Sequence, residues 1–357
     1  MGKKIKNNKK KIALFFPVTG IGGAERRLSR IFVNLEEKKE IEVTWIILSK
    51  ESKEKIEKKY ISVLGKKIKI LVFHNNLQVI LHFLFIKYNI VFYTDCCYRT
   101  IPVIYSCILS RKKRCMLNVT NDIKLLDKFS YLHNVQLSSQ LDCLYPTNFK
   151  LLKDKFPQKK ILLTPGSFTD LKKFYPDTNK EKYIIFSGRL IKEKGILLFI
   201  EAIVAIKNEI ILKDYKVIIL GDGNLKEKIE QIIQDNELQK YVEIKYTLNV
   251  EKIVRKGKIF CSLMPDGNYP SQSLIEALSC GLFCIVTDTG DSHLMIRNSF
   301  GILIKQNKEE LIKALKQAMS LSEKDYQEIK SSAVNFIKEN YTIDKSEEHY
   351  RKIIDEL

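Results

Sequence analysis

The sequence predicts an α/β protein of two domains, each a mostly parallel sheet covered by helices on both faces. Its 357 residues are enough for two hydrophobic cores of ordinary size. Short apolar segments of strand length alternate along the chain with segments of helical periodicity, which is typical of parallel sheets. In each half an apolar strand runs directly into a glycine turn that opens a helix, as in nucleotide-binding α/β domains.

Residues 1–165 are expected to form the first domain. The apolar segment Lys11–Pro17 predicts a strand, and the glycine turn after it leads into a helix from Ala24. Glu25 stands where a dinucleotide fingerprint has its third glycine, and a carboxylate there argues against NAD. Later strands are expected at Glu42–Leu48, Ile68–Phe73, Ile90–Thr94, Cys115–Val119 and Lys160–Thr164. Helices are expected at Lys50–Tyr60, Leu77–Ile86, Ile101–Leu109 and Asn148–Phe156.

Residues 166–180 are expected to form a hinge between the domains. The stretch Pro165–Asp177 contains two prolines and a glycine and shows no sustained periodicity. Residues 181–340 are expected to form the second domain, and three helical stretches follow Asn307, the last of them from Thr342 to Leu357. Its strands are expected at Tyr183–Phe186, Lys216–Leu220, Val242–Ile244, Ile259–Leu263, Leu282–Thr287 and Gly301–Ile304.

The stretch Met264–Asp291 contains a turn, a helix and a strand in clear order. Its start is rich in proline and glycine and predicts a loop, Ser271 is the expected N-cap, and Gly281 ends the helix. The first amides of such a helix are free to bind an anion. Glu276, about one turn further on, offers a carboxylate that can accept two sugar hydroxyls. The stretch therefore suggests a ligand that contains phosphate and ribose.

A second set of loops lies at the start of the second domain. Gly188 makes the turn after the first strand, and Arg189 and Lys194 follow on a short loop. Their cationic ends can converge at the carboxyl end of a strand, where open α/β sheets bind ligands. Two solvated loop cations are the alternative interpretation. Gly221–Gly223 forms a similar turn after the next strand.

These segments resemble the group 1 glycosyltransferases, a retaining, family 4-like group of GT-B fold that includes bacterial polysaccharide glycosyltransferases. The resemblance rests on SGRLIKEKG, GDG and NYPSQSLIEA, which occur in order and at family-like intervals over residues 180–300. It implies two Rossmann-like domains whose parallel sheets face each other across a cleft. The first domain would bind the acceptor and the second the nucleotide sugar, and residues 341–357 would form a helix that crosses back to the first domain.

The resemblance implies catalytic roles for Arg189, Lys194 and Glu276. The two cations would stabilise the departing diphosphate, and Glu276 would hold the ribose hydroxyls. Donor-binding residues are expected at Gly22, Gly23, Gly188, Gly221, Gly223, Asn268, Tyr269, Ser271, Gln272 and Ser273. No D-x-D motif stands near the donor loop, so we expect neither a metal nor another cofactor, the nucleotide diphosphate sugar being a substrate.

Two positions depart from the family pattern. Glu276 matches the second of two acidic residues in the donor loop, whereas the first falls on Asn268. A histidine that family members often carry in the first domain is replaced by a segment without one, and His74 is the only other candidate that we consider. The segment at that place contains Asn118, Thr120, Asn121 and Asp122.

The predicted reaction is a retaining glycosyl transfer (EC 2.4) from a nucleotide diphosphate sugar to a saccharide acceptor. We expect this acceptor to be lipid-linked and its product to enter a cell-surface polysaccharide such as capsule or lipopolysaccharide. A GT-B nucleotide-sugar epimerase would share the donor pocket and is one alternative. A peripheral membrane or nucleic-acid-binding protein with an inactive donor site is the other.

Charge is distributed unevenly along the chain, whose net charge is +19. Lys and Arg outnumber Asp and Glu by 32 to 13 in residues 1–165 and match them at 29 each in residues 166–357. The first domain is therefore expected to face an anionic membrane surface, a lysine-rich proteome being the alternative explanation. Nucleic acid is disfavoured, because the aromatic residues lie mainly in apolar segments. The candidate membrane contacts are Lys9–Lys11, Lys53–Lys59, Lys66–Lys69 and Arg111–Arg114.

The sequence also bears on location. No run approaches the ~18 consecutive apolar residues of a membrane span, and the basic N-terminus has too short an apolar stretch for a signal peptide. We expect a cytoplasmic protein associated with the inner face of the cytoplasmic membrane. The eight cysteines form no C-x-x-C pair and are expected to be free thiols in the core.

Overall fold

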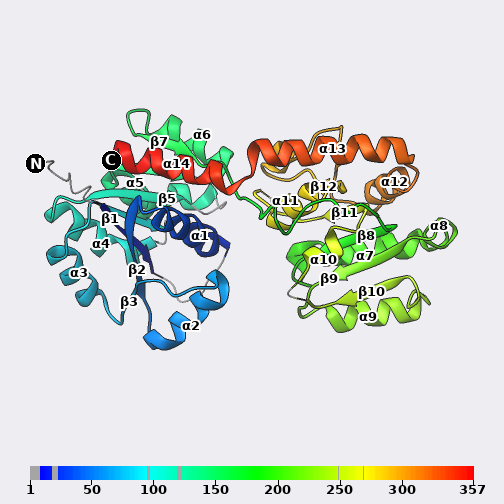
Figure 1. Ribbon diagram of the computed structural model, residues 1–357, viewed down its shortest axis with the longest axis horizontal. Helices are drawn as coiled ribbons and strands as arrows, with labels where there is room; N and C mark the ends of the chain where they lie inside the picture. The colour runs from blue at the N-terminus through cyan, green and yellow to red at the C-terminus, as the bar shows by residue number, and fades with distance from the viewer. Residues whose placement is uncertain (1–8, 18–22, 95–96, 119–122, 248, 268) are drawn as a thin grey trace, which may run out of the picture. The chain divides into compact units, whose positions relative to one another are not determined.

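The computed structural model describes residues 9–17, 23–94, 97–118, 123–247, 249–267 and 269–357. These residues form two compact units, one of Met1–Pro165 with Asp344–Leu357 and the other of Gly166–Ile343. Both are built on parallel sheets, as the sequence predicts, and Figure 1 labels their elements. None of the helices in the described part of the chain is long and apolar enough to cross a bilayer.

The first unit contains a seven-stranded parallel sheet in the order β3-β2-β1-β4-β5-β6-β7. Its strands are β1 (Lys10–Phe16), β2 (Ile41–Leu48), β3 (Ile70–Phe73), β4 (Ile90–Thr94), β5 (Lys113–Asn118), β6 (Gln140–Cys143) and β7 (Ile161–Leu163). Its helices are α1 (Gly23–Glu37), α2 (Lys53–Leu64), α3 (Asn76–Phe85), α4 (Cys97–Leu109), α5 (Phe129–Leu137), α6 (Pro146–Lys155) and α14 (Ile343–Glu356), with a 3-10 turn η1 (Ile123–Asp127). The sequence analysis did not predict β6 or α5.

Strand β6 escaped prediction because it alternates polar and apolar residues over only four positions, although all four are buried. The polar residue Asp142 lies in the interior because helix α14 supplies its partners. Tyr350 donates its hydroxyl hydrogen to Asp142 over 2.8 Å, and His349 Nε2 lies 2.7 Å from the same carboxylate. The Tyr350 ring packs against Phe32 and Phe92, at centroid distances of 5.3 and 6.1 Å. The last helix therefore completes the core of the first unit.

The second unit contains a six-stranded parallel sheet in the order β10-β9-β8-β11-β12-β13. Its strands are β8 (Tyr183–Ser187), β9 (Lys216–Leu220), β10 (Val242–Lys245), β11 (Ile259–Ser262), β12 (Phe283–Thr287) and β13 (Gly301–Ile304). Its helices are α7 (Ile196–Ala205), α8 (Lys207–Leu212), α9 (Lys226–Asp235), α10 (Glu251–Val254), α11 (Gln272–Ser279), α12 (Lys308–Ala318) and α13 (Glu323–Asn340), with the 3-10 turns η2 (Lys192–Lys194) and η3 (Ser292–Met295).

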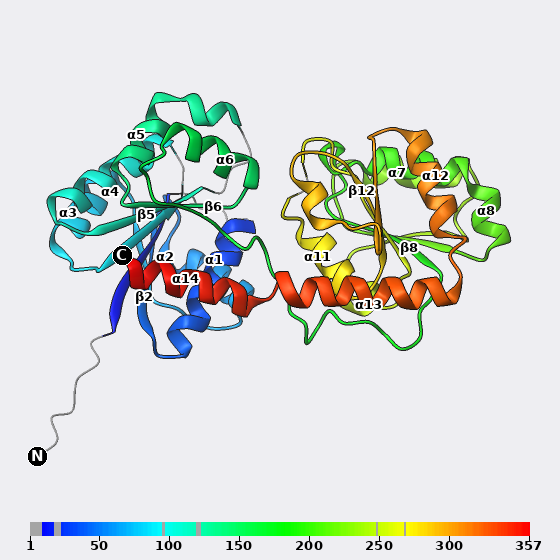
Figure 2. The same cartoon turned by 90° about the horizontal axis from the view of Figure 1, so that it is seen from above.

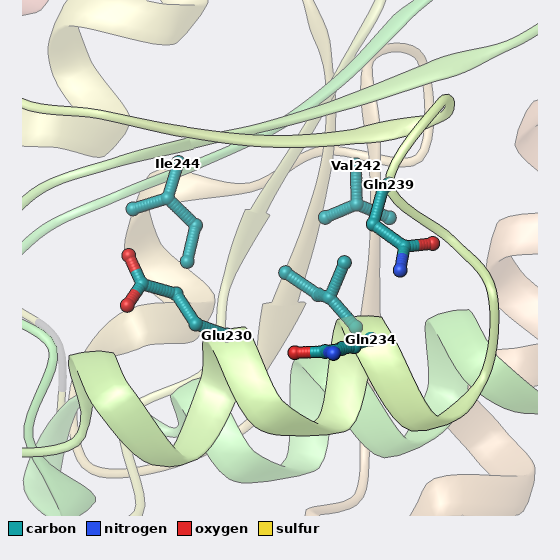
Figure 3. Close-up of a pocket in the computed structure, with 6 residues that line it drawn as sticks. Glu230, Gln234, Gln239, Val242 and Ile244 are labelled. Atoms are coloured by element: carbon teal, nitrogen blue, oxygen red, sulfur yellow. The ribbon is translucent and has the colours of Figure 1, made fainter.

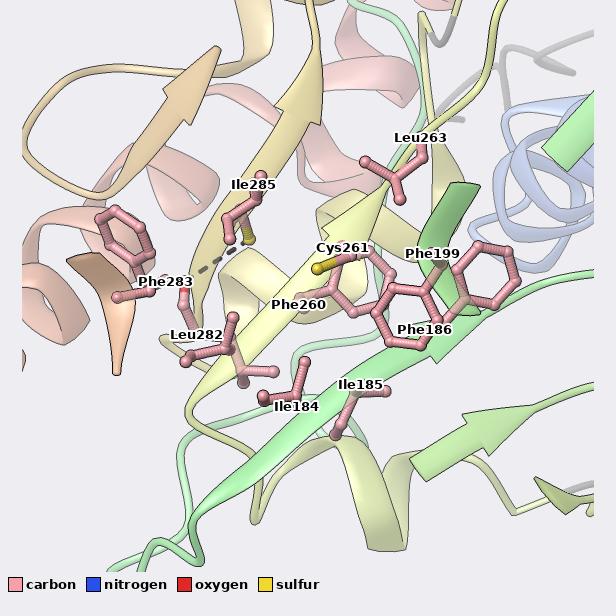
Figure 4. Close-up of a cluster of buried hydrophobic side chains, with 14 of the residues drawn as sticks. Ile184, Ile185, Phe186, Phe199, Phe260, Cys261, Leu263, Leu282, Phe283 and Ile285 are labelled. Carbon is pink, nitrogen blue, oxygen red and sulfur yellow. Dashed lines mark hydrogen bonds between the residues drawn. The ribbon is translucent and has the colours of Figure 1, made fainter. Parts of the chain in front are cut away.

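Helices cover both faces of the second sheet. Helix α7 packs with α9 and α12, whereas α11 packs with α10 and α13. The apolar side chains of β8, β11 and β12 fill the core on both faces of the sheet, and Ile184, Phe186 and Phe260 are among them (Figure 4). The six cysteines whose side chains the structure describes are free and buried, as expected for core thiols.

The segment expected as a hinge belongs to the second unit. Phe168 and Phe174 are buried. Lys180 donates to the carbonyl oxygens of Arg255 and Cys280, each over 2.7 Å, and to a third carbonyl, that of Gly257, over 3.1 Å. These contacts fix residues 166–180 on the second unit, so the boundary between the units lies before Gly166. The irregular sequence reflects an extended packed segment and not a free linker.

Candidate functional site

The loops after β8 and β11 leave the second sheet side by side, because the strand order reverses between these two strands. A reversal of strand order opens a crevice at the carboxyl ends of parallel strands, where open α/β folds bind ligands. The loop after β8 carries Arg189 and Lys194, and the loop after β11 leads into α11, which carries Glu276. The three residues predicted to be catalytic therefore come from neighbouring loops at one edge of the sheet.

Glycines allow the loops after β8 and β9 to pack backbone against backbone. The amide of Gly188 donates to Leu220 and the amide of Leu190 to Asp222, both over 2.9 Å. A Cβ on Gly221 would lie 1.9 Å from the Gly188 carbonyl oxygen, and one on Gly223 would lie 2.5 Å from the Leu190 carbonyl oxygen. Gly221 and Gly223 are thus required by the fold itself, before any role in donor binding.

The loops after β8 and β11 are joined in the same way. Gly195 has a φ of 73°, and a Cβ there would lie 2.0 Å from the Leu263 carbonyl oxygen. This close approach brings Lys194 to the end of β11. Its aliphatic chain passes over Gly188, with Cδ 3.9 Å from the position of a Cβ there, and its Nζ lies 3.2 Å from Met264 Sδ.

Arg189 and Lys194 form a pair of cations without a matching anion. Burial first, and then the charge of Arg189, lower the pKa of the Lys194 ammonium group below its usual value. A thioether is a weak acceptor, and in the part of the chain that the structure describes neither cation has a salt bridge to a carboxylate. Two adjacent cations held on rigid loops favour an anion, and a diphosphate would satisfy both.

The N-terminus of α11 adds hydrogen-bond donors beside these cations. Ser271 is the N-cap, and its hydroxyl accepts from the amide of Leu274 over 3.3 Å. The amides of Gln272 and Ser273 have no acceptor within the described ranges. Free amides and the positive end of the helix dipole favour a negative group at this position.

Glu276 is held in place by its own helix and by the segment that precedes β8. Gln272 Nε2 donates to Glu276 Oε1 over 3.0 Å and to the carbonyl oxygen of Phe168 over 3.1 Å. Ser167 donates its hydroxyl hydrogen to Gln272 Oε1 over 2.6 Å. Gln272, predicted to bind the donor, thus positions Glu276. Sequence reasoning missed Ser167, which lies 105 positions from Gln272 and carries no local signal.

The remaining predicted donor-binding residues are distributed as follows. Tyr269 lies against Gly166 and Tyr341, whose hydroxyl pKa is raised by burial and then by Tyr269. Gly23 is the first residue of α1, in the other unit. Gly22 and Asn268 lie outside the described residues.

The structure describes only some of the first-domain residues that were considered for the role of the family's histidine. His74 Nδ1 lies 2.8 Å from the carbonyl oxygen of Ser49, so this ring is tied to the turn after β2. Asn118 ends β5. Thr120, Asn121 and Asp122 lie outside the described residues. The role stays unassigned.

Comparison with known proteins decides the family. Residues 167–335 match the family model described as "Glycosyl transferases group 1". The second unit belongs to the group 1 glycosyltransferases. The match contains Arg189, Lys194 and Glu276 together with every glycine of the packed loops.

Curated relatives agree with this assignment. An uncharacterized glycosyltransferase of Methanocaldococcus jannaschii is 32% identical over 196 residues, which are 50% of this chain and 47% of that protein. A Campylobacter jejuni α-1,4-N-acetyl-D-galactosaminyltransferase, named for an undecaprenol-diphosphate-linked saccharide, is 26% identical over 58% of each chain. An Escherichia coli UDP-Gal:α-D-GlcNAc-diphosphoundecaprenol α-1,3-galactosyltransferase is 28% identical over 52% of each. The chain spans about half the length of these relatives.

Solved structures show the same GT-B fold over nearly the whole chain. A glycosyltransferase from Rickettsia africae has a TM-score of 0.77 at 16% identity and covers 98% of both chains. Anabaena HepE in complex with UDP has a TM-score of 0.78 at 12% identity and covers 98% of this chain and 100% of its own. The GT-B fold thus includes the first unit, which the family model does not match.

A groove elsewhere on the group 1 glycosyltransferase unit is not part of this site. It encloses about 310 Å³ between α9 and β10, at the edge of the sheet and two strands from β8 (Figure 3). Its lining residues are Glu230, Ile233, Gln234, Gln239, Val242 and Ile244. It contains no cation to attract a diphosphate. In the described part of the chain, no three His, Cys, Asp or Glu residues are grouped so as to hold a metal ion.

Proposed function

We propose that this group 1 glycosyltransferase moves a sugar, with retention of anomeric configuration, from a nucleotide diphosphate sugar to a lipid-linked saccharide. The proposal depends on one observation above all: Arg189 and Lys194 lie together at the carboxyl ends of β8 and β11 without a carboxylate partner among the described residues. Support for the acceptor class comes from the relatives, two of which are named for undecaprenol-diphosphate-linked saccharides.

In the proposed reaction the bond between sugar C1 and the diphosphate oxygen breaks as the acceptor oxygen bonds to C1. The acceptor hydroxyl proton passes to an oxygen of the leaving phosphate on the same face of the sugar, so no protein nucleophile is required. Negative charge grows on the diphosphate in the transition state. Arg189, Lys194 and the free amides at the start of α11 stabilise that charge, and Glu276 holds the ribose hydroxyls.

We further propose that the reaction needs no metal ion and no other cofactor, since two protein cations already face the diphosphate. The site of action would be the inner face of the cytoplasmic membrane, where a lipid-linked acceptor lies within reach. The product would then enter a cell-surface polysaccharide, with capsule and lipopolysaccharide as the two classes to examine. The excess of basic residues in residues 1–165 supports an anionic membrane as the partner of the first unit.

The experiment has two stages. Thermal unfolding of the full-length protein is first measured with a panel of nucleotide diphosphate sugars, and one of them should raise the midpoint increasingly as its concentration rises above its Kd. Transfer from that sugar to a short-chain polyprenyl-diphosphate saccharide is then followed, and the configuration at C1 of the product is determined by NMR. Retained configuration supports the proposal. Interconversion of the sugar without an acceptor would show an epimerase, and binding without turnover would show an inactive donor site.

A further inference from the structure

One face of the first unit exposes large apolar side chains. Leu77, Leu81 and Phe85 occur at intervals of four on α3 and therefore lie on one side of that helix. Their exposed fractions are 63%, 45% and 77%, and Ile86, directly after the helix, is 46% exposed. The sequence predicted only that this apolar segment is a helix, and the structure shows that the described residues leave this side of the helix uncovered.

The exposed row continues onto the neighbouring helix α4. Leu109 is 74% exposed and Tyr105, one turn earlier, is 45% exposed. Helices α3 and α4 pack side by side, and Figures 1 and 2 both show them as neighbours. Their carboxyl ends are joined because Ser110 and Lys112 both donate to the Phe83 carbonyl oxygen, over 3.1 and 2.6 Å. Phe85 and Leu109 therefore belong to one end of one surface.

Helix α5 extends the surface further. Tyr105 hydrogen-bonds to His133 Nε2 over 2.8 Å, and the His133 ring stacks on Phe129 with the centroids 5.8 Å apart. Phe129 is 82% exposed, and Ile123 on the preceding turn is 49% exposed. We call this set the α3–α5 face. Its members are Leu77, Leu81, Phe85, Ile86, Tyr105, Leu109, Ile123 and Phe129.

The cations of the first unit are not equally free to meet an anionic surface. The first three of the four predicted runs contain lysines that already pair with carboxylates of the same unit. These pairs are Lys10–Asp355, Lys53–Glu57, Lys59–Glu51, Lys66–Glu37 and Lys69–Glu42. The fourth run, Arg111–Arg114, has no salt bridge within the described residues.

This fourth run adjoins the α3–α5 face. Arg111 and Lys113 are exposed and follow Leu109 directly, and Lys87 is exposed next to Ile86. Residues 76–114 contain six Lys and Arg and a single acid, Asp95. Apolar side chains edged with unpaired cations match the interface of an anionic bilayer, where the apolar groups enter the acyl boundary and the cations meet lipid phosphates.

We propose that the α3–α5 face is the membrane-binding surface of the protein and inserts Phe85 and Leu109 into the headgroup region of an anionic leaflet. The inference rests on the proposed function for the reason why the protein approaches lipid at all. A second copy of the chain fits the face less well, because a symmetric contact would press together two surfaces that both carry the cations Lys87, Arg111 and Lys113. The lysine run of α2, in which Lys53 and Lys59 already pair with glutamates, takes a minor part.

The test uses full-length protein and sedimentation with vesicles of phosphatidylglycerol and phosphatidylcholine. Replacing Leu81, Phe85 and Leu109 together by Ser removes the apolar contact and should lower vesicle affinity at least about tenfold, at low and at high salt. Replacing Arg111 and Lys113 together by Glu should lower affinity for anionic vesicles by a similar factor, and it should also weaken the dependence of binding on salt.

Matched controls come from the second unit and from α2. Leu212 is 84% and Tyr246 72% exposed, and the Leu212→Ser/Tyr246→Ser variant should bind vesicles like the wild type. Lys53→Glu/Lys58→Glu makes the same charge change as the Arg111/Lys113 variant, but on α2, and should reduce binding less. Equal losses in the two charge variants, or unchanged binding in the apolar variant, would overturn the proposal.

Two further measurements separate the possible outcomes. Light scattering of the apolar variant gives its oligomeric state, and a dimer of the wild type that dissociates in this variant would show an interface between copies instead. Transfer to a water-soluble acceptor should be unchanged in all of these variants, since none lies in the donor site. Vesicle binding through this face without any transfer activity would contradict the proposed function but would still support the membrane-binding surface.

Discussion

The two units of this protein share the same pattern of strand order and differ in the contacts that hold their elements together. In the second unit, Gly195 and Gly221 let neighbouring loops touch backbone to backbone at the carboxyl ends of the strands. In the first unit, the buried carboxylate of Asp142 joins β6 to the final helix through Tyr350 and His349. The second unit thus contains a rigid cradle of loops, which we propose binds the donor, and the first unit relies on a helix from the far end of the chain.

The surfaces differ as well. Basic and acidic residues balance in residues 166–357, whereas basic residues dominate in residues 1–165. Of the exposed large apolar residues, most lie in the first unit, and eight of these fall between Leu77 and Phe129. The comparison teaches that two units with the same sheet order can differ in their loop contacts and in their outer helix faces, because sheet architecture constrains neither.

The largest effect on stability is expected when the polar contact of Asp142 with Tyr350 and His349 in the first unit is broken. Asp142→Leu leaves the Tyr350 hydroxyl and His349 without their partner in the interior, and we expect a loss of about 3–5 kcal/mol in the free energy of unfolding. Urea unfolding followed by circular dichroism measures it. Asp127→Leu removes a carboxylate that is 78% exposed and whose only salt bridge among the described residues is to Lys155, so the loss should stay within about 0.5 kcal/mol. Equal losses would contradict the assigned role of Asp142.

The next effect tests the cradle of the second unit through catalysis. Arg189→Ala and Lys194→Ala should each lose about 2–4 kcal/mol of transition-state stabilisation, because each removes a preorganised cation from a developing anion. The measurement is kcat/KM for the donor, with circular dichroism as a check of folding. The double variant should lose less than the sum, since both cations serve one diphosphate. Wild-type activity in both single variants would show that Arg189 and Lys194 are solvated loop cations without a catalytic role.

A smaller effect is expected when a glycine that the fold needs is compared with a glycine that has room for a side chain. Gly221→Ala places a Cβ 1.9 Å from a carbonyl oxygen, and we expect about 3 kcal/mol of destabilisation, the upper end of the overpacking range. Gly188→Ala meets nothing nearer than 3.9 Å and should cost less than about 1 kcal/mol. Both are measured by urea unfolding. If the two variants were equally stable, the loops would not be locked as the structure indicates.

The pH dependence of stability provides a fourth test, at Lys180. Burial lowers the pKa of this ammonium group to about 8. Above that pH the folded chain releases a proton that the unfolded chain still binds, so the free energy of unfolding should rise with pH. Relative to Lys180→Met, the wild type should gain about 1–2 kcal/mol between pH 8 and 9.5. Thiol and tyrosine titration is common to both proteins and cancels in the difference; parallel pH curves would refute the prediction.

The last prediction is that removal of divalent metal ions has no effect on the rate of transfer. If Arg189 and Lys194 supply the positive charge that faces the diphosphate, an excess of EDTA should leave the initial rate of transfer unchanged. The assay uses protein dialysed against chelator, with and without added Mg²⁺ or Mn²⁺. Activity that disappears with EDTA and returns with a divalent ion would show that the cradle holds a metal as well as the donor.

The sequence alone determined the features that arise from short-range patterns. Alternating strand and helix segments predicted two parallel α/β sheets. Ser271 predicted the start of α11, and the spacing of Arg189 and Lys194 placed both cations on one loop. Such features depend on local hydrogen bonding, capping and periodicity, which adjacent residues decide among themselves.

Only the tertiary structure decided the features that join distant residues. Strand β6 forms because α14 supplies partners for Asp142 from 207 and 208 positions away. The expected hinge is fixed to the second unit because Lys180 finds three carbonyl oxygens there. The apolar segment of α3 is exposed on one side because none of the described elements packs over it. A sequence shows which polar or apolar side chains need a partner, but the residue that becomes this partner is decided by how the elements pack.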